Sequence, residues 1–180
     1  KEIYISEDGY NWTLVCDDFA TNSGIEGNIK LIKNFNIDRY VIIIEDTFFF
    51  FTEPGFFDLT KPKSDWITSE YFEYTISSGK VIDVLSNRTY YFAITDTSKV
   101  YKFEEDDTKN GLNEKMVNME VVESNMNTSF VSGTTFEEKP IICIADEGNK
   151  IVRIEPEWGR WIEDITPTGF STIFTKIVSC

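Results

Sequence analysis

The feature that most constrains this chain is an internal repeat of about fifty residues. Asp46, Asp96 and Asp146 each stand in a short turn between two apolar runs, with about fifty positions from one to the next. Self-similarity of this length is typical of folds that stack one supersecondary unit several times, such as solenoids and propellers. The repeat therefore narrows the possible architectures before any single motif is considered.

A second series of similar segments recurs in phase with these turns. Trp12 and Trp161 hold the same position in the first and the last of its four copies. Two periodic series in one phase indicate that whole units, and not single turns, are repeated. The copies read SEDGYNW at residues 6–12, TEPGFFD at 52–58, EEDDTKN at 104–110 and EPEWGRW at 155–161.

The pattern of apolar residues predicts an all-β chain. Short runs rich in Ile, Val, Phe, Tyr and Thr are bounded by Gly, Pro, Asn and Asp, and no segment keeps a helical period for three turns. Each unit holds four strands, which we name a to d in chain order. We place a strands at residues 28–35, 80–85, 130–135 and 170–178, b strands at 40–45, 89–95 and 140–145, c strands at 3–6, 47–52, 99–104 and 150–155, and d strands at 12–16, 65–69, 114–121 and 161–165.

Four antiparallel strands per unit predict the blades of a β-propeller rather than a sandwich. The strands make three complete blades, flanked by a c–d half-blade and a single a strand. Because a propeller normally has roughly four to eight blades, we expect either a segment of a larger propeller or an irregular small one closed by its two ends. Residues 1–180 would form this single domain or segment, with units at about 1–27, 28–79, 80–129, 130–169 and 170–180.

One turn carries a recognisable motif. Ser6, Asp8, Gly9 and Trp12 form the pattern S-x-D-G-x-x-W between two predicted strands. In such a turn Ser or Asp accepts backbone N–H bonds, Gly takes a positive φ and Trp folds back as an apolar plug. The pattern resembles the Asp-box, or bacterial neuraminidase repeat, of the sialidase-like propeller superfamily. The resemblance implies a structural role, away from the ligand face, for these four residues and for Trp161 in the last copy.

The same resemblance raises the alternative of a sialidase-type glycoside hydrolase. That family uses an arginine triad, a Tyr nucleophile with a Glu base, and an Asp acid. Here Arg153 stands in R-I-E-P, which is similar to the family's F/Y-R-I-P motif but has an inserted Glu. The chain has no histidine, the commonest general base and transition-metal ligand. We therefore expect no enzymatic activity, no catalytic residue and no cofactor.

Two groups of polar residues are candidates for binding. Asp106, Thr108 and Asn110 place oxygens at alternate positions before a Gly, as at the start of a calcium loop, but the closing Glu is absent. We therefore interpret this segment as a solvated acidic turn without a metal. If a glycan site exists, we expect it near the repeated turns, although turn formation is the favoured role of their acids. Those acids are Asp46, Asp96 and Asp146.

The aromatic runs favour burial. Four consecutive phenylalanines at residues 48–51 predict a strand buried on both faces, and Phe56 with Phe57 would pack in the same way. The alternative is an exposed aromatic platform for a sugar. Cys16 and Cys143 are interpreted as small apolar strand residues, because three cysteines without CxxC spacing suggest neither a zinc site nor a disulfide framework.

Charge and composition limit the partners. The formal net charge is −14 at pH 7, and the 17 basic residues are scattered, so nucleic acid and an anionic bilayer would be repelled. No apolar run approaches the length of a membrane span, so we expect no membrane insertion. We predict a non-catalytic structural or recognition module.

The resemblance also implies a setting. Propellers with repeats of this kind occur in phage tail and baseplate proteins, and the richness in Asn, Ile, Lys and Phe fits the codon bias of AT-rich genomes. We therefore expect a virion or extracellular component that binds a cell-surface glycan or a neighbouring subunit of an assembly. A pure assembly module that binds no glycan is the alternative.

Overall fold

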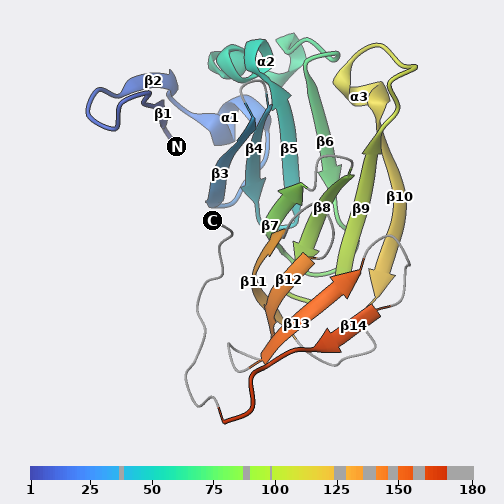
Figure 1. Ribbon diagram of the computed structural model, residues 1–180. Helices are drawn as coiled ribbons and strands as arrows, with labels where there is room; N and C mark the ends of the chain where they lie inside the picture. The colour runs from blue at the N-terminus through green and yellow to red at the C-terminus, as the bar shows by residue number, and fades with distance from the viewer. Residues whose placement is uncertain are drawn as a thin grey trace. The chain divides into compact units, whose positions relative to one another are not determined.

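The computed structural model describes residues 1–36, 39–86, 90–97, 99–123, 129–135, 141–145, 150–155 and 161–169 (Figure 1). The chain divides into two compact units. The first comprises Lys1–Thr75 and Asp107–Lys115, and the second comprises Ile76–Asp106 and Met116–Cys180. In the described part of the chain, both units are built chiefly of antiparallel β-sheet.

The first unit holds one four-stranded sheet and one hairpin. The hairpin pairs β1 (Ile3–Ile5) with β2 (Thr13–Cys16). The sheet has the order β3-β4-β5-β6, with every neighbouring pair antiparallel. Its strands are β3 (Ile29–Asn36), β4 (Arg39–Ile44), β5 (Thr47–Thr52) and β6 (Tyr71–Thr75).

The second unit holds two further sheets of the same kind. One comprises β7 (Val81–Ser86), β8 (Tyr90–Thr95), β9 (Lys99–Glu105) and β10 (Met116–Glu123), paired in that order. The other comprises β11 (Phe130–Thr135), β12 (Ile141–Ala145), β13 (Lys150–Glu155) and β14 (Trp161–Asp164), again in chain order. β11 lies beside β7, and Leu85, Phe92, Phe130 and Val152 contribute to one shared core.

Three four-stranded antiparallel sheets with the strand order a-b-c-d, and a separate c–d pair, confirm the predicted fold class. Most predicted strands begin within two residues of the observed ones. The d strand predicted at residues 65–69 is wrong, because the chain first forms short helices and pairs only at β6. The a strand predicted at residues 170–178 lies outside the described residues.

Single-turn helices interrupt the strands at places where no helix was predicted. In the first unit they are α1 (Phe19–Ser23), α2 (Glu53–Phe57), η1 (Asp58–Thr60), η2 (Lys63–Asp65) and α3 (Leu112–Lys115). Thr52 caps α2 by accepting a hydrogen bond from the Gly55 amide, and Pro54 occupies the first turn. Helices of one turn are too short to show a 3.6-residue period, so the apolar pattern could not predict them. None of the helices in the described part of the chain has the length and apolar character needed to span a bilayer.

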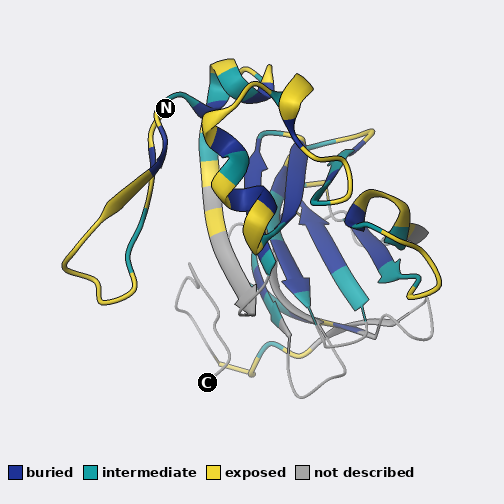
Figure 2. Cartoon of the chain, turned by 90° about the horizontal axis from the view of Figure 1, so that it is seen from above, coloured by how far each residue is buried: buried dark blue, intermediate teal, exposed yellow. Residues whose placement is uncertain are grey.

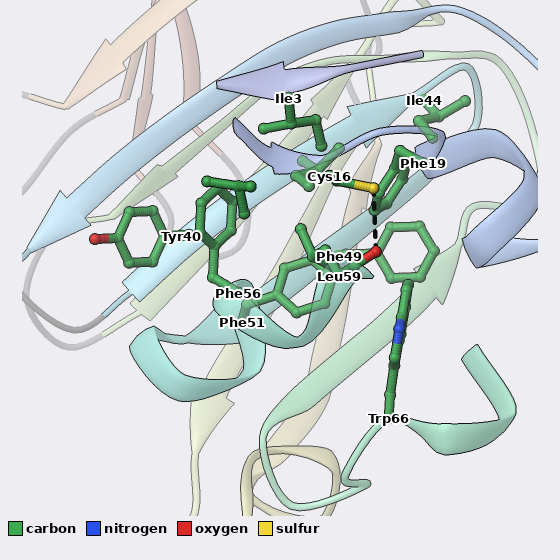
Figure 3. Packing of buried hydrophobic residues seen from close by; sticks show 12 residues of the cluster. Ile3, Cys16, Phe19, Tyr40, Ile44, Phe49, Phe51, Phe56, Leu59 and Trp66 are labelled. Carbon is green, nitrogen blue, oxygen red and sulfur yellow. Dashed lines mark hydrogen bonds between the residues drawn. The ribbon is translucent and has the colours of Figure 1, made fainter. Parts of the chain in front are cut away.

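The core of the first unit gathers around alternate phenylalanines of β5 (Figure 3). Phe49 and Phe51 are fully buried, with ring centroids 5.7 Å apart. Trp66 meets both edge-on, at 6.1 and 5.6 Å, while Tyr40 stacks on Phe56 at 4.3 Å. Burying each large apolar side chain contributes roughly 1.5–3 kcal/mol, so this cluster is a main source of the unit's stability.

The opposite face of β5 is buried as well. Phe48 and Phe50 are fully buried, and the Phe48 ring lies 5.9 Å from that of Tyr74. The prediction that residues 48–51 are buried on both faces is therefore confirmed. The same prediction is wrong for Phe57, which is 47% exposed although its neighbour Phe56 is buried. A one-turn helix directs only some of its side chains inward.

Cys16 belongs to this core. Its side chain is fully buried, and its Sγ donates a hydrogen bond of 3.1 Å to the carbonyl of Leu59 (Figure 3). Burial raises the pKa of the Cys16 thiol. The interpretation of Cys16 as a small apolar strand residue is thus confirmed. Cys143 lies in β12, where its side chain is not described, and Cys180 lies outside the described residues.

Candidate interaction surface

The β1–β2 hairpin is exposed toward its turn and buried at its other end. Ile3, Val15 and Cys16 are buried in the core of the first unit. Tyr4 and Leu14 are register partners across the hairpin, so their side chains lie on the same face. They are 46% and 47% exposed. An apolar cross-strand pair of this exposure leaves the outer face of the hairpin uncovered in the described structure.

Two aromatic residues extend this exposed face. Trp12 lies directly before β2, two positions from Leu14, and Tyr10 lies in the turn between β1 and β2. Trp12 is 62% exposed and Tyr10 is 88% exposed. We call Tyr4, Tyr10, Trp12 and Leu14 the hairpin face. Figure 2 shows exposed residues running along this hairpin after the N-terminus.

The exposure of Trp12 corrects an expectation. Its predicted role as an apolar plug is wrong, because the turn between β1 and β2 closes through polar groups alone. Asp8 Oδ1 accepts hydrogen bonds of 2.8 Å from the amides of Tyr10 and Asn11. Ser6 Oγ accepts one of 2.8 Å from the amide of Gly9, whose φ is +77°. The indole is therefore not needed to close the turn.

Asp8 is the centre of this turn. Its second oxygen, Oδ2, accepts a hydrogen bond of 2.7 Å from Asn11 Nδ2, and Ser6 Oγ donates to Oδ1 at 3.2 Å. The amides of Asn11 and Tyr10, followed by the Asn11 side chain, hold the pKa of Asp8 well below its usual range. A carboxylate with this many donors fixes the loop that carries Tyr10 and leads into Trp12.

The second and third copies of this turn differ in structure from the first. The second copy, at residues 52–58, forms α2, where a Cβ on Gly55 would lie 2.5 Å from the Glu70 carbonyl oxygen. In the third copy the chain leaves β9 and turns before α3. In the fourth, residues 156–160 lie outside the described residues, and Trp161 begins β14 with its side chain not described. In the three copies whose turn is described, the strands of the repeat recur, but the turn that follows the c strand differs.

Asp46 and Asp96, two of the repeated acids, lie in hairpin turns between b and c strands. Asp46 is exposed between β4 and β5, where its Oδ1 accepts a hydrogen bond of 3.2 Å from Thr47 Oγ1. Asp96 Oδ1 accepts one of 2.7 Å from the Lys80 amide, and the Asp96 amide donates to the Lys80 carbonyl at 3.1 Å. Asp96 thus connects the turn between β8 and β9 to Lys80, the residue directly before β7. Asp146 lies outside the described residues.

The acidic turn with Asp106, Thr108 and Asn110 precedes α3. The residue that begins α3, Leu112, is hydrogen-bonded to the segment that leads into β6. The Leu112 amide donates a hydrogen bond of 2.8 Å to the carbonyl of Ser69, and the Leu112 side chain is buried. Among the described residues, no group of three or more His, Cys, Asp or Glu side chains is placed to hold a metal ion.

Arg153, from the segment that resembles the sialidase motif, is exposed on β13.

β1 differs from the other c strands in its pairing. β5, β9 and β13 are interior strands, each hydrogen-bonded to a b strand on one edge and to a d strand on the other. Within the described residues, β1 pairs only with β2. One edge of β1 therefore presents backbone groups without a ladder partner in the described structure. The sequence pattern marked Trp12 of the hairpin face, but as a buried plug, and no signal in the sequence marked the exposure of Tyr4 and Leu14.

The surroundings of the hairpin face are acidic. Glu2 precedes β1 and Glu7 follows it, and both side chains are exposed. Glu2 Oε2 also accepts a hydrogen bond of 2.9 Å from the Tyr4 hydroxyl, which orients that ring. Asp17, just beyond β2, is exposed as well. A ligand that covers this face would meet Glu7 at one end of β1. At the other end it would meet Glu2 together with Lys1, whose N-terminal ammonium pairs with Asp18 at 2.8 Å.

Comparisons with known proteins identify the architecture. No family model matches the chain, and no curated protein matches its sequence. Among solved structures, the chain is similar to YCF48 from Cyanidioschyzon merolae, with a TM-score of 0.60 and 11% identity over 96% of this chain and 54% of that one. It is also similar to the Cps50 (Swd1) β-propeller domain of Myceliophteria thermophila, with a TM-score of 0.56 and 8% identity over 78% of this chain and 41% of that one.

A third similar structure is described as YCF48 bound to D1 peptide. It matches with a TM-score of 0.50 and 15% identity, over 88% of this chain and 45% of that one. The chain thus spans about half the length of the solved structures it matches. These likenesses show a propeller-type repeat fold, in agreement with the three sheets described above.

Proposed function

We propose that this chain is a non-catalytic recognition module that binds a protein partner through the hairpin face. The observation that carries the proposal is the exposure, between 46% and 88%, of four large apolar or aromatic side chains on one short hairpin. Exposed apolar residues that occur singly need no explanation, but a contiguous group marks an interaction site. Tyr and Trp are also the residues most enriched at binding hot spots.

The rigidity of the turn supports this proposal. Four hydrogen bonds join Asp8 and Ser6 to the amides of Gly9, Tyr10 and Asn11 and to the Asn11 side chain. Binding is weakened by the entropy lost when loops become ordered. A loop that is already ordered in the free protein loses less conformational entropy on binding. Tyr10 and Trp12 can therefore contribute more of their contact energy to affinity.

The comparison with YCF48 bound to D1 peptide gives independent support, since a propeller of similar fold binds a peptide. The acidic net charge of −14 favours a partner with basic groups near its contact surface. The lack of histidine in the chain supports a non-catalytic role.

The test is a selection from a displayed library of random short peptides against the whole chain. We expect the selected peptides to lose at least about tenfold in affinity for Trp12→Ala and Tyr10→Ala, since such rings are typical hot spots. Ile67→Ala is the matched control, because Ile67 is 54% exposed but lies outside the hairpin face. Binders that are insensitive to both hairpin variants, or equally sensitive to Ile67→Ala, would contradict the proposal.

A glycan is the second candidate ligand. The specific observation is that Tyr10 and Trp12 expose aromatic rings on a fixed loop, and such rings can stack on the apolar face of a sugar. A glycan array with the wild-type chain and the Trp12→Ala variant distinguishes the two candidates. Trp12-dependent glycan binding without peptide binding would favour the glycan.

For the biological setting we propose a virion or extracellular component, as the likeness of Ser6, Asp8, Gly9 and Trp12 to an Asp-box implies. Mass spectrometry of purified phage particles would detect the chain if it belongs to a phage tail or baseplate. The enzymatic alternative is a sialidase-type hydrolase. A panel of fluorogenic glycosides would reveal it, and we expect no turnover.

A further inference from the structure

We infer that Asn110 is a site of spontaneous covalent modification, where deamidation releases α3 from the segment that leads into β6. In this reaction the backbone nitrogen of Gly111 attacks Cγ of Asn110. The new N–Cγ bond closes a succinimide ring, and the Cγ–Nδ2 bond breaks, so that ammonia leaves with the proton of the backbone amide. Water then opens the ring at either carbonyl, which leaves aspartate or isoaspartate in place of Asn110.

The first support is the dipeptide itself. Asn110 is the one asparagine in the chain that is followed by glycine. Glycine has no Cβ, so its backbone nitrogen can approach the preceding side chain with the least steric hindrance. Asparagine is also among the residues that are chemically least stable to heat. Asn110 therefore combines a reactive side chain with the least hindered backbone nucleophile.

The second support is that both reacting groups are accessible and unbonded. Asn110 is exposed, and Gly111 is not fully buried. Among the described residues, neither the Asn110 side chain nor the Gly111 N–H has a hydrogen-bond partner. A hydrogen bond to either group would have to break before the ring could close. Its absence removes that contribution to the barrier.

The chain contains an internal comparison, because Asp8 also precedes a glycine and can form the same ring. There the Gly9 amide already donates a hydrogen bond of 2.8 Å to Ser6 Oγ. The Asp8 carboxylate accepts hydrogen bonds of 2.8 Å from the amides of Tyr10 and Asn11. At neutral pH this carboxylate is ionised and lacks the leaving group that an amide supplies. We therefore expect the turn at Asp8 to persist under conditions in which the asparagine–glycine pair reacts.

The third support is the close fit around Gly111, which connects the reaction to α3. Gly111 has a φ of +94°, and a Cβ there would lie 2.7 Å from Ser69 Cβ. The next residue, Leu112, is buried, and its amide donates a hydrogen bond of 2.8 Å to the Ser69 carbonyl. The Gly111 carbonyl accepts hydrogen bonds from the amides of Glu114 and Lys115, at 3.2 and 3.0 Å. All these residues belong to the first unit.

Isoaspartate changes the backbone directly before this fit. Its peptide bond runs through the former side-chain carbonyl, which adds a carbon atom to the main chain. Because backbone bond lengths are fixed, the longer chain moves Gly111 away from its present contact with Ser69. The Leu112 amide then loses its bond to Ser69. Aspartate keeps the ordinary linkage, so it adds a negative charge but leaves α3 in place.

The experiment ages the whole chain at physiological temperature and mildly alkaline pH and then maps its peptides by mass spectrometry. Aspartate and isoaspartate peptides separate by reversed-phase chromatography, and electron-transfer fragmentation identifies each. Asn110→Gln is the matched control, because it keeps a neutral amide whose longer side chain forms the cyclic imide far more slowly. Asn110→Asp carries the added charge on an ordinary backbone. Both variants should fold, since the Asn110 side chain is exposed and makes no hydrogen bond to the described residues.

We expect Asn110 to lose most of its amide, chiefly to isoaspartate, while the exposed Asn113 and the Asp8 turn remain unchanged. Hydrogen exchange of the aged chain, read on the separated peptides after peptic digestion, should be faster at Leu112 in the isoaspartate form than in the aspartate form. The variant Asn110→Asp should exchange as the unaged chain does.

Two results would overturn the inference. If Asn110 keeps its amide as long as Asn113 does, the modification is wrong. If Leu112 exchanges equally in the isoaspartate and aspartate forms, or loses protection as much in aged Asn110→Gln, the release of α3 is wrong. Neither result depends on the hairpin face, so the peptide selection described above still decides the recognition role.

Discussion

Asp8 shows how one exposed side chain determines local structure. Its carboxylate accepts hydrogen bonds from two backbone amides and one side-chain amide. These bonds exist only in the folded turn and favour the charged form of the carboxyl group. The order of the loop that carries Tyr10 should therefore depend on pH.

We predict that this loop loses order at acidic pH. Because the folded-state pKa of Asp8 lies below its ordinary value of about 3.9, the carboxylate stabilises the turn at every pH above that value. The stabilisation is lost as the pH falls through the folded-state pKa. Backbone amide shifts of Tyr10 and Asn11, followed by NMR from neutral pH downward, should show this step.

Asp8→Asn is the matched control for this titration. An asparagine side-chain oxygen can accept the same two backbone hydrogen bonds but does not ionise. The variant should keep the turn and lose the step in the amide shifts. A step of the same size in Asp8→Asn would show that another group controls the loop.

Cys16 provides a second prediction at the scale of the residue. Its thiol is fully buried and donates to the Leu59 carbonyl, and burial raises its pKa. Since the thiolate is the reactive form, we expect iodoacetamide to leave Cys16 unmodified in the folded chain at neutral pH. Peptide mapping by mass spectrometry would report Cys16 separately from Cys143 and Cys180. Labelling of Cys16 as fast as in denaturant would contradict the described core.

The elements differ in what their tryptophans contribute. Trp66 follows η2, is 6% exposed, contacts Phe49 and Phe51, and donates from Nε1 to the Lys61 carbonyl at 2.8 Å. Trp12 stands directly before the hairpin strand β2 and is 62% exposed. The same side chain therefore serves packing in one element and is available for binding in the other.

We predict that Trp66→Ala lowers the free energy of unfolding by about 3–5 kcal/mol, as expected for a buried aromatic residue replaced by alanine. Trp12→Ala should change it by less than about 1 kcal/mol, because little of the ring leaves a packed environment. Urea unfolding of both variants provides the measurement. Equal effects of the two substitutions would mean that Trp12 packs in solution as the original plug hypothesis required.

At the scale of elements, the sequence predicted strands better than connections. The c strand at residues 47–52 was predicted at its observed bounds, because its apolar run and flanking turn residues are local signals. β6 was missed because Trp66 and Ile67 resemble strand residues, while Tyr71–Thr75 pairs only after the chain has passed through α2, η1 and η2. Where a strand begins after a long connection is set by pairing with its neighbour and not by composition.

The charge of the whole chain leads to a prediction about salt. With a formal net charge of −14, like charges repel one another more in the compact state than in the expanded unfolded chain. Raising NaCl from about 0.01 M to about 0.15 M shortens the screening length from about 30 Å to about 8 Å. We therefore expect the thermal unfolding midpoint to rise over this range. KCl at equal concentration should act alike, and a midpoint that falls with both salts would contradict self-repulsion as the dominant effect.

The sequence by itself determined the repeat, the strand order within each unit and the all-β class. These follow from alternation, apolar runs and turn residues, which act over a few neighbouring positions. It also indicated the polar turn around Asp8, because Ser, Asp and Gly at that spacing can close a loop without help from the rest of the chain.

Only the tertiary structure decided which apolar residues are covered. Trp66 is buried and Trp12 is exposed, and Phe56 is buried beside an exposed Phe57, although each pair is similar in chemistry. In the hairpin, Tyr4 is 46% exposed beside the buried Ile3, and Leu14 is 47% exposed beside the buried Val15. Whether a residue is buried depends on which other helices and strands pack against it. Those elements are encoded elsewhere in the chain, so the sequence around the residue does not predict its burial.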